Sequence, residues 1–467
     1  MRTSASTRKG PAGKNSGCGE LLPERELRGI VETVLRLAKA SAAEETEVHV
    51  EEVADALTRF ANNGIHQNVF EHGVTVSVRT VSDGRTARAS TNRLDEEALR
   101  EAIEASLSLA QSQPKDPRLL PMPGKQHYRA MNRFVRATAA LTPEDRARAV
   151  RRACELAVRK GQVAAGIFSS GMHQTAKGNS RGLFAAYHET HSQFSITMQK
   201  DGAASWAKAD AADTRAIDSQ KLAERASEKA HLAVNPKELA PGRYTVILEP
   251  AAVLDLVGFI FYDFAATAVK DKRSCLNDRM GKPLFGQNIS ISDDVFHPLQ
   301  QGAPFDGEGM RRQKVLLVDR GVPRNLVYSR GAAKSAGKKP TGHGFVLPNE
   351  EGEAPVNLVF SGGDSSVEKM VAATDRGLLV TRLWYIREVD PYEKVLTGMT
   401  RDGLFLVEKG KVAGAVRNFR FNQSLIEMLR NVELLSPAVR ASGEESFEMA
   451  VPAMKVRDFQ FSEVTKF

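Results

Sequence analysis

The sequence predicts an α+β protein, in which a two-part α+β N-terminal region is followed by a C-terminal domain of mixed β-sheets with few helices. The chain has 467 residues, more than one compact core usually holds. Helical and strand patterns are mixed before residue 240, whereas strand patterns outnumber helices after it. Stretches rich in proline, glycine and polar residues at 111–127 and 235–243 divide the chain between these parts.

Five segments are predicted to be helices, because their apolar residues recur at close to helical spacing or their composition favours a helix. The start of the third is the most clearly marked. Thr142 can cap that helix, and Pro143 fits its first turn. The predicted helices span residues 22–40, 95–110, 142–160, 219–234 and 251–269.

Short segments in which apolar and polar residues alternate are predicted to be strands. Asn63 and Gly64 give one turn signal, and Asp83 and Gly84 give another that predicts a β-hairpin. The predicted strands span residues 45–53, 74–81, 86–90, 163–169, 182–188, 191–198, 244–248, 315–319, 356–360, 377–385 and 404–408.

These elements give a division of the chain into four parts. Residues 1–20 are rich in Ser, Gly, Lys and Ala and are predicted to be a disordered tail. Residues 21–115 are predicted to form an N-terminal α+β subdomain, and residues 128–238 a second one. Residues 240–467 form the predicted C-terminal mixed-sheet domain.

Composition argues against several classes of function. The net charge is +8, but basic and acidic residues are interspersed, so nucleic acid is not the expected partner. The three cysteines, Cys18, Cys154 and Cys275, lie far apart, which favours neither a disulfide framework nor a cysteine-rich zinc site and fits the reducing cytoplasm. No stretch has the length of a membrane span, and the N-terminus lacks the apolar segment of a secretory signal.

The segment from His188 to His191, with Glu189 between them, resembles a zinc motif at first sight. A working H-E-x-x-H motif needs its histidines four residues apart, so that both project from one helix face. Here they are three apart in a strand-like pattern, and on a strand they face opposite sides. We expect ordinary strand residues, with a ligand role for one histidine as the alternative.

Three acidic or glycine-rich stretches are further candidates. Asp293 and Asp294 could bind a divalent cation or simply end a strand in solvent. Asp306 and Glu308 lie in a glycine-rich stretch and could act as an acid/base pair. Residues 361–364 (SGGD) could hold an anion with backbone amides, although a plain turn is the commoner meaning.

Several stretches together resemble the TldD/PmbA family of two-subunit proteases. The segments RFANNGIHQN (59–68) and NSRGL (179–183) are similar to its N-terminal and middle regions. GAPFDGEGM (302–310), KPTGHGF (339–345) and RGLLVTRLW (376–384) are similar to its C-terminal region, on the PmbA (TldE) side of the family. The resemblance spans roughly residues 45 to 435.

The family's catalytic subunit carries H-E-x-x-x-H on a helix that corresponds here to residues 251–269, with a late cysteine as a further zinc ligand. This segment contains no histidine, and no cysteine follows Cys275. Asp255 and Asp263 are its only carboxylates, and apolar residues surround them. We therefore expect a packing helix, and assign no catalytic, cofactor-binding or metal-ligating residue to this chain.

The resemblance implies a non-catalytic, TldE-like subunit that carries no cofactor itself and pairs with a zinc-bearing TldD-like subunit, or else with a second copy of itself. The substrate would be an unfolded or short peptide, and no membrane partner is expected. Two alternatives remain open. One is a divergent metallopeptidase that works alone through His188, His191 or the acidic loops; the other is a binding or assembly protein without proteolytic activity.

Overall fold

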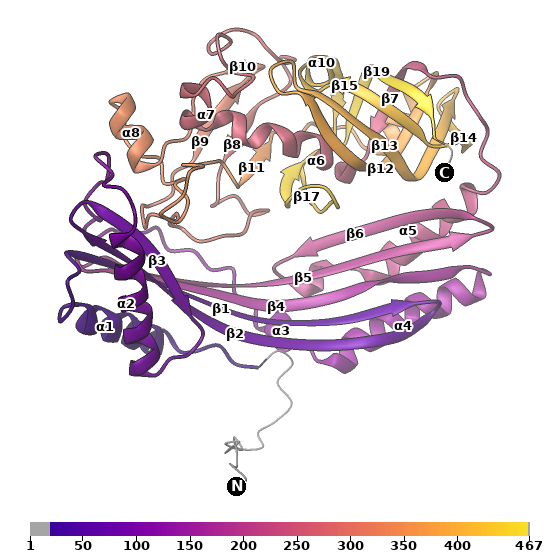
Figure 1. The fold of residues 1–467 in the computed structure, drawn as a ribbon. Helices are drawn as coiled ribbons and strands as arrows, with labels where there is room; N and C mark the ends of the chain where they lie inside the picture. The colour runs from indigo at the N-terminus through magenta and orange to yellow at the C-terminus, as the bar shows by residue number, and fades with distance from the viewer. Residues whose placement is uncertain (1–18, 466–467) are drawn as a thin grey trace.

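The computed structural model describes residues 19–465, so residues 1–18 of the predicted tail lie outside the described part. The N-terminal half forms one long curved sheet with helices on its convex side, and the C-terminal domain packs over the concave side (Figure 1). Helices and sheets mix in the first half, and strands dominate the second. The predicted α+β class is confirmed.

The N-terminal sheet has six antiparallel strands in the order β3-β2-β1-β4-β5-β6. The two predicted N-terminal subdomains contribute three adjacent strands each. The strands are β1 (Glu45–Ala61), β2 (Gly64–Ser82), β3 (Arg85–Thr91), β4 (Val163–Asn179), β5 (Phe184–Lys200) and β6 (Ala203–Ala211).

These strands are much longer than the sequence predicts. The predicted strands 182–188 and 191–198 are one strand, because Glu189 and Thr190 continue the ladder, paired with His173 and Met172 of β4. Polar residues occupy the concave face, and small residues such as Ala54 and Ala56 line parts of the convex face. The small residues on the convex face weaken the apolar alternation on which a strand prediction depends.

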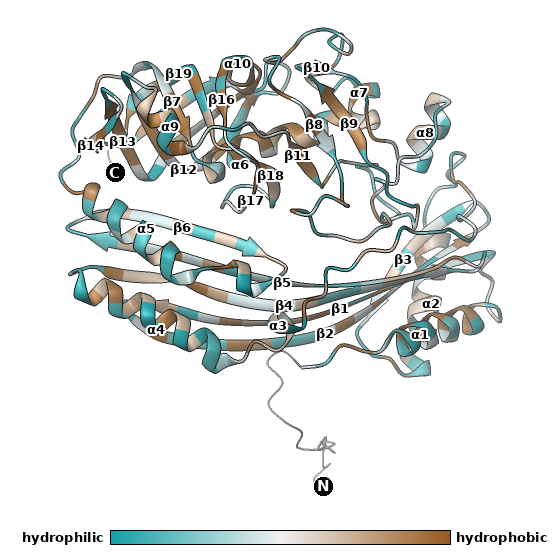
Figure 2. Cartoon of the chain, turned by 180° about the vertical axis from the view of Figure 1, so that it is seen from behind, coloured by the Kyte–Doolittle hydropathy of each residue, from teal (hydrophilic) through white to brown (hydrophobic). Residues whose placement is uncertain are grey.

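Four helices cover the convex face. α1 (Glu24–Ala38) and α2 (Glu96–Gln111) pack at one end, and α4 (Pro143–Arg159) and α5 (Ser219–Leu232) at the other. Their apolar sides face the sheet, and polar residues follow the outer side of α4 (Figure 2). The predicted start of α4 is confirmed: Thr142 and Asp145 form a reciprocal capping box.

The C-terminal domain consists of two sheets around one large core. Its first sheet contains β12 (Arg376–Asp390), β7 (Gly242–Leu248), β19 (Met454–Val464), β15 (Phe419–Ser424), β13 (Val395–Glu408), β14 (Lys411–Ala415) and β16 (Val432–Leu435). Its second contains β10 (Val322–Pro323), β9 (Val315–Asp319), β8 (Ile291–Asp293), β11 (Leu358–Phe360), β18 (Met449–Val451) and β17 (Val439–Ala441).

The predicted single helix over 251–269 is wrong. The chain forms α6 (Pro250–Val257), a 3-10 turn segment (Gly258–Phe264) and α7 (Ala266–Lys270). The middle segment reads GFIFYDF, and glycine, phenylalanine, tyrosine and isoleucine all favour a helix less than alanine or leucine does. A Cβ on Gly258 would lie 2.0 Å from the hydroxyl of Ser446, so this glycine lets a distant loop approach the break.

Candidate functional site

A cavity of about 590 Å³ opens at the break between α6 and α7. A volume of this size is typical of ligand pockets. The aromatic side chains of Phe261 and Phe447 meet edge to face on its wall, with ring centroids 5.1 Å apart. Charged side chains complete the lining. The lining residues are Gly258, Phe259, Phe261, Tyr262, Asp263, Arg273, Glu388, Lys394, Glu444, Glu445, Ser446 and Phe447.

A buried ion pair closes one side of the cavity. The Nζ atom of Lys394 lies 2.5 Å from Asp263 and 2.7 Å from Glu388. Burial disfavours the charge on Lys394, but the two carboxylates outweigh it and raise the pKa of the ammonium. The other oxygen of Asp263 accepts a hydrogen bond from the backbone N–H of Cys275 at 2.7 Å. Asp263 is therefore held by protein groups on both oxygens.

Asp255, on α6, holds the loop whose residues 444–447 line the cavity. Its carboxylate accepts hydrogen bonds from the backbone N–H groups of Glu444 and Glu445, at 3.2 and 3.1 Å. A Cβ on Gly443 would lie 2.1 Å from the same carboxylate, so only glycine permits this approach. Burial raises the pKa of Asp255 to about 7. This carboxyl group therefore changes charge near neutral pH.

The residues at this position do not fit a zinc ion. Zinc in proteins is held by several converging nitrogen, sulfur or oxygen donors. Here Asp255 accepts from two backbone amides and Asp263 is paired with an ammonium group. Burial raises the pKa of the Cys275 thiol well above its usual range, which disfavours the thiolate that binds metal. Within residues 19–465, no group of three or more His, Cys, Asp or Glu side chains is placed to hold a metal ion.

The two candidate histidines of the H-E-T-H segment lie on β5 and face opposite sides of the sheet. His188 is exposed on the helix side and contacts the edge of Phe134, with ring centroids 4.9 Å apart. His191 lies on the concave side, where its Nε2 atom is 3.2 Å from a carboxylate oxygen of Asp55. Burial disfavours the charge on His191, but Asp55 outweighs it and raises the pKa. The segment is thus not a helical zinc motif.

Asp306 and Glu308 lie in a loop that packs onto the N-terminal sheet. The Asp306 carboxylate accepts hydrogen bonds from the backbone N–H groups of Glu308, Met310 and Gly344, at 2.8 to 2.9 Å. Glu308 accepts one from the N–H of Arg330 at 2.7 Å, and burial together with Asp306 raises the pKa of Glu308 to about 7. Both carboxyl groups are enclosed, so they order the loop and do not form an open acid/base pair.

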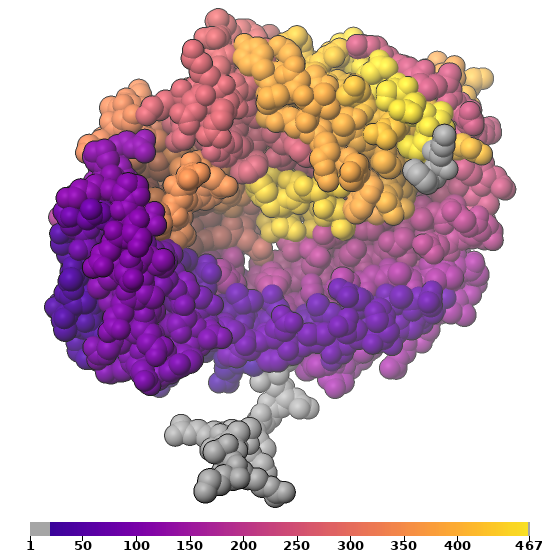
Figure 3. All heavy atoms as spheres, in the orientation of Figure 1, coloured from indigo at the N-terminus to yellow at the C-terminus, as the bar shows by residue number. Residues whose placement is uncertain are grey.

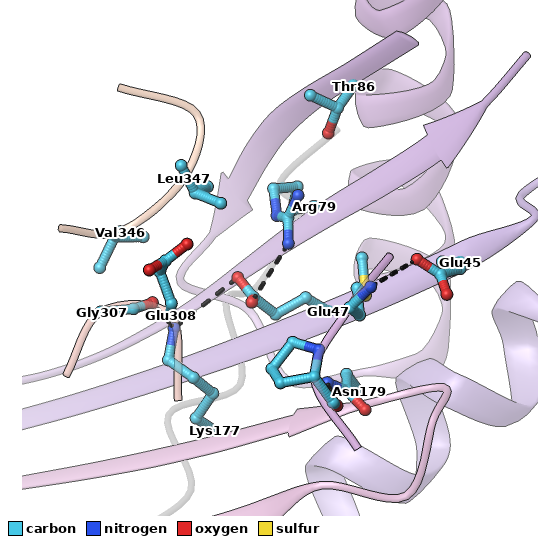
Figure 4. A network of polar contacts seen from close by, with 12 residues as sticks. Glu45, Glu47, Arg79, Thr86, Lys177, Asn179, Gly307, Glu308, Val346 and Leu347 are labelled. Carbon is cyan, nitrogen blue, oxygen red and sulfur yellow. Dashed lines mark hydrogen bonds and ion pairs between the residues drawn. The ribbon is translucent and has the colours of Figure 1, made fainter. Parts of the chain in front are cut away.

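The same loop closes a buried charge network that the sequence prediction missed (Figure 4). Glu47 lies 3.4 Å from Arg79, 2.5 Å from Arg88 and 3.7 Å from Lys177. Lys177 also donates a hydrogen bond to the carbonyl of Gly307 at 2.6 Å. Burial opposes ionisation of Glu47, yet the three cations hold its pKa well below the usual range. The sequence signal was weak, since these residues only look like the polar half of a strand pattern.

The remaining candidates have structural partners. Asp293 is buried at the end of β8, not solvated, and lies 2.8 Å from Nε2 of His343, the histidine of the KPTGHGF stretch. Asp294 pairs with Lys314 at 3.2 Å. In the 361–364 turn, the N–H of Ser361 bonds to a backbone carbonyl, as does that of Gly363, so these amides are not available for an anion.

None of the helices within residues 19–465 combines the length and apolar character that a membrane span requires.

Sequence comparison places the chain among known proteins. Residues 241–463 match the PmbA/TldA metallopeptidase C-terminal domain, and residues 46–110 match PmbA/TldA metallopeptidase domain 1.

Relatives of similar length extend this match. The metalloprotease PmbA of Escherichia coli O157:H7 is 23% identical over 92% of this chain and 96% of its own length. The metalloprotease PmbA homolog of Haemophilus influenzae is 24% identical over 88% of this chain and 91% of its own length. A higher identity, 31%, covers only 35% of this chain and 39% of an uncharacterized protein from Methanocaldococcus jannaschii.

Solved structures share the whole fold. The crystal structure of TldE from Thermococcus kodakarensis superposes with a TM-score of 0.83 at 21% identity, and the match covers 93% of this chain and 99% of that one. A structure from Thermotoga maritima has a TM-score of 0.81 at 21% identity, with 93% and 100% covered. The resemblance drawn from the sequence is confirmed, and the chain belongs to the TldD/PmbA family of metallopeptidases.

Proposed function

We infer that this chain is a non-catalytic, TldE-like subunit of a zinc metallopeptidase pair that processes unfolded or short peptides. One observation carries the proposal. At the position where the resemblance expects zinc ligands, the chain has a broken helix whose carboxylates, Asp255 and Asp263, are bound to backbone amides and to Lys394. The zinc ion would then belong to a TldD-like partner, and this subunit would form part of the wall around the shared interior.

The cavity supports a role in holding peptide. It lies beside the loop 442–448, which reaches the N-terminal sheet: Lys208 on β6 donates a hydrogen bond to the carbonyl of Gly443 at 2.7 Å. Figure 3 shows that the molecule is hollowed between the N-terminal sheet and this part of the C-terminal domain. Aromatic walls with a few charged groups suit an extended peptide with mixed side chains. The described cysteines, Cys154 and Cys275, are free and buried, in keeping with a cytoplasmic site of action.

The test is metal analysis of the purified chain, together with cleavage of an unstructured peptide by the chain alone and with a TldD-like subunit from the same genome. We expect no stoichiometric zinc and no cleavage by the chain alone, and chelator-sensitive cleavage once the partner is added. One zinc per chain with chelator-sensitive cleavage would overturn the proposal. In that case, loss of zinc in His191→Ala but not in the exposed His188→Ala would locate the site.

A further inference from the structure

The cavity at the break between α6 and α7 has more acidic than basic side chains in its lining. Two cations line it, Arg273 and Lys394. Arg273 is exposed and pairs at 3.3 Å with Asp271, which lies outside the lining, and Lys394 is shared between Asp263 and Glu388. The carboxylates of the lining are those of Asp263, Glu388, Glu444 and Glu445. The cavity therefore keeps an excess of negative charge.

Two of these carboxylates, those of Glu444 and Glu445, keep acceptor capacity. The Nζ atom of Lys208 lies 3.6 Å from Glu444, but its short hydrogen bond, at 2.7 Å, goes to the carbonyl of Gly443. Arg387 lies 3.8 Å from Glu445 and donates at 2.6 Å to the backbone carbonyl of the preceding residue. No side chain within residues 19–465 donates a hydrogen bond to either carboxylate. Both can therefore accept from a ligand.

The carboxylate of Glu445 is held in place by an unusual stretch of backbone. β12 bulges between Trp384 and Arg387, and Tyr385 within this bulge has a φ of 54°. A bulky residue rarely adopts this left-handed conformation, and bulges often re-aim groups beside functional sites. The N–H of Tyr385 donates to one oxygen of Glu445 at 2.7 Å. The bulge thus orients this carboxylate and leaves its other oxygen for a ligand.

Aromatic rings lie beside the two glutamates. Phe447 belongs to the same loop, and its ring meets that of Phe261 edge to face. Phe259 and Tyr262 also line the cavity, and all four aromatic side chains are half-buried. Aromatic rings attract cations, and they pack well against the aliphatic stem of a long basic side chain. Carboxylates and aromatic rings together therefore favour a ligand that is both long and cationic.

We propose that this cavity binds a basic side chain, arginine or lysine, of a peptide, with the cationic head at Glu444 and Glu445 and the stem along the phenylalanine rings. The inference rests on the proposed function in that the ligand is a peptide. An uncharged side chain would displace water from the carboxylates without replacing its hydrogen bonds. The preference for a basic residue arises from this chain's own lining and requires no zinc.

The test is the binding of short synthetic peptides to the isolated full chain, measured by calorimetric titration in the presence of EDTA. The peptides consist of glycine and serine around one central residue, with an acetylated N-terminus and an amidated C-terminus. The central residue is arginine, lysine or citrulline, which has nearly the shape of arginine without its charge. At low salt we expect the two basic peptides to bind at least about tenfold more tightly than the citrulline peptide.

Variants of the lining locate the site. Glu444→Gln and Glu445→Gln should each weaken binding of the arginine peptide about threefold or more, and together they should remove the preference over citrulline. Glutamine keeps the size of the side chain and an oxygen that can accept from Tyr385. Phe447→Leu should also weaken binding of the basic peptides. Glu448→Gln is the matched control and should leave the affinity unchanged, since Glu448 lies on the same loop but outside the lining.

Three results would overturn the inference. One is equal affinity for the arginine and citrulline peptides, or no binding of the arginine peptide at about 1 mM. Another is a loss in Glu448→Gln as large as in Glu444→Gln, because the overall charge of the loop would then be the cause. The last is a citrulline peptide with a free N-terminus that binds as tightly as the arginine peptide, since the cavity would then recognise a terminal ammonium group.

These outcomes are separate from those of the proposed function. Zinc in the chain, with cleavage by the chain alone, would contradict the non-catalytic role but would leave a measured preference for basic peptides standing. Failure of the peptides to bind would leave the metal analysis and the cleavage assay with a partner unchanged.

Discussion

The ammonium group of Lys394 lies 2.5 Å from the carboxylate of Asp263, and both side chains are buried. Asp263 belongs to the segment where a catalytic member of the family is expected to carry zinc ligands. Lys394 comes from the turn between β12 and β13, far along the chain. A cation contributed by the protein therefore stands beside the carboxylate in the region where a metal ion would otherwise be expected. We therefore expect mutations of this ion pair to change the free energy of unfolding.

Replacing Lys394 by methionine should lower the free energy of unfolding by about 3–5 kcal/mol, because it leaves the buried Asp263 without its counter-charge. The double variant Asp263→Asn with Lys394→Met should lose less, since the buried residue 263 no longer carries a charge; Glu388 loses the lysine in both variants and is partly exposed. Urea unfolding of the three proteins measures both changes. Lys411→Met, at an exposed site on β14, is the control. Equal losses in the single and the double variant would show that the unpaired charge of Asp263 is not the cause of the loss.

Stability should fall as pH rises from about 5 to 8, in part because of Asp255. Its pKa is raised to about 7 in the folded chain, against about 3.9 in an unfolded one. In the window between these values the folded state holds a proton that the unfolded state releases. Stability therefore decreases with pH, at a slope that approaches about 1.4 kcal/mol per pH unit for one proton. Glu308, with a pKa of about 7, acts in the same direction.

Asp255→Asn should flatten this dependence, so that the variant gains stability relative to the wild type at pH 8 compared with pH 5. Urea unfolding at several pH values measures the slope. The exposed Asp364→Asn serves as control and should leave the slope unchanged. Parallel pH curves for wild type and Asp255→Asn would contradict the raised pKa.

Local sequence signals predicted much of the architecture. The cap at Thr142 and the turn at Asp83 and Gly84 are specified by neighbouring residues alone, and both are found where the sequence predicts them. The long strands were underestimated because small residues such as Ala54 and Ala56 on their convex face interrupt the apolar alternation. The break at Gly258 was missed because the apolar composition of 251–269 was given more weight than the weak helix preference of its middle segment, GFIFYDF.

The resemblance to the family indicated where the candidate site lies in the sequence. Only the structure showed which side chains line it and how they are bonded. The sequence alone showed that the expected zinc ligands are missing from 251–269. It could not show that Lys394 and Phe447 complete a cavity there, because contacts between distant residues leave no periodic pattern. For Asp306 and Glu308, the sequence suggested an acid/base role. The structure shows enclosed carboxyl groups bonded to backbone amides.

Gly171 lets Asp55 and His191 meet across β4, since a Cβ there would lie 1.9 Å from the Asp55 carboxylate and 2.5 Å from the His191 ring. Gly171→Ala should push these two side chains apart and lower the pKa of His191, because the carboxylate that raises it moves away. NMR titration of the His191 ring measures this shift. The fold should tolerate the change, as both obstructing groups are side-chain ends.

Two other glycine-to-alanine variants give reference values for the effect of Gly171→Ala on stability. At Gly166 an added Cβ would lie 2.0 Å from the backbone carbonyl of Ser195, so Gly166→Ala should destabilise the sheet more than Gly171→Ala does. Gly29, on α1, has open space around its Cα, and Gly29→Ala should stabilise the chain by about 0.5–1 kcal/mol. Thermal unfolding ranks the three variants. A Gly171→Ala variant with an unchanged His191 pKa would show that the pair survives.

Glu47 is the shared anion of Arg79, Arg88 and Lys177, and Lys177 in turn reaches the C-terminal loop at Gly307. Glu47→Gln should cost about 3–5 kcal/mol of unfolding free energy, because Arg79, Arg88 and Lys177 lose their common counter-charge in a buried place. Lys177→Met should cost less, since Glu47 keeps both arginines and only the carbonyl of Gly307 loses its donor. Urea unfolding gives the two values, with the exposed Glu32→Gln as control.

The Glu47→Gln variant should also loosen the contact between the two halves of the chain, because Lys177 and Arg88 both reach carbonyl groups of the C-terminal domain, at Gly307 and Leu347. Calorimetry is the direct measurement. The wild type should unfold in one transition, and the variant should show the N-terminal sheet melting separately from the C-terminal domain. If Lys177→Met proves the more damaging change, the hydrogen bond to the loop outweighs the charge network, and Glu47 is not the anion on which the interface depends.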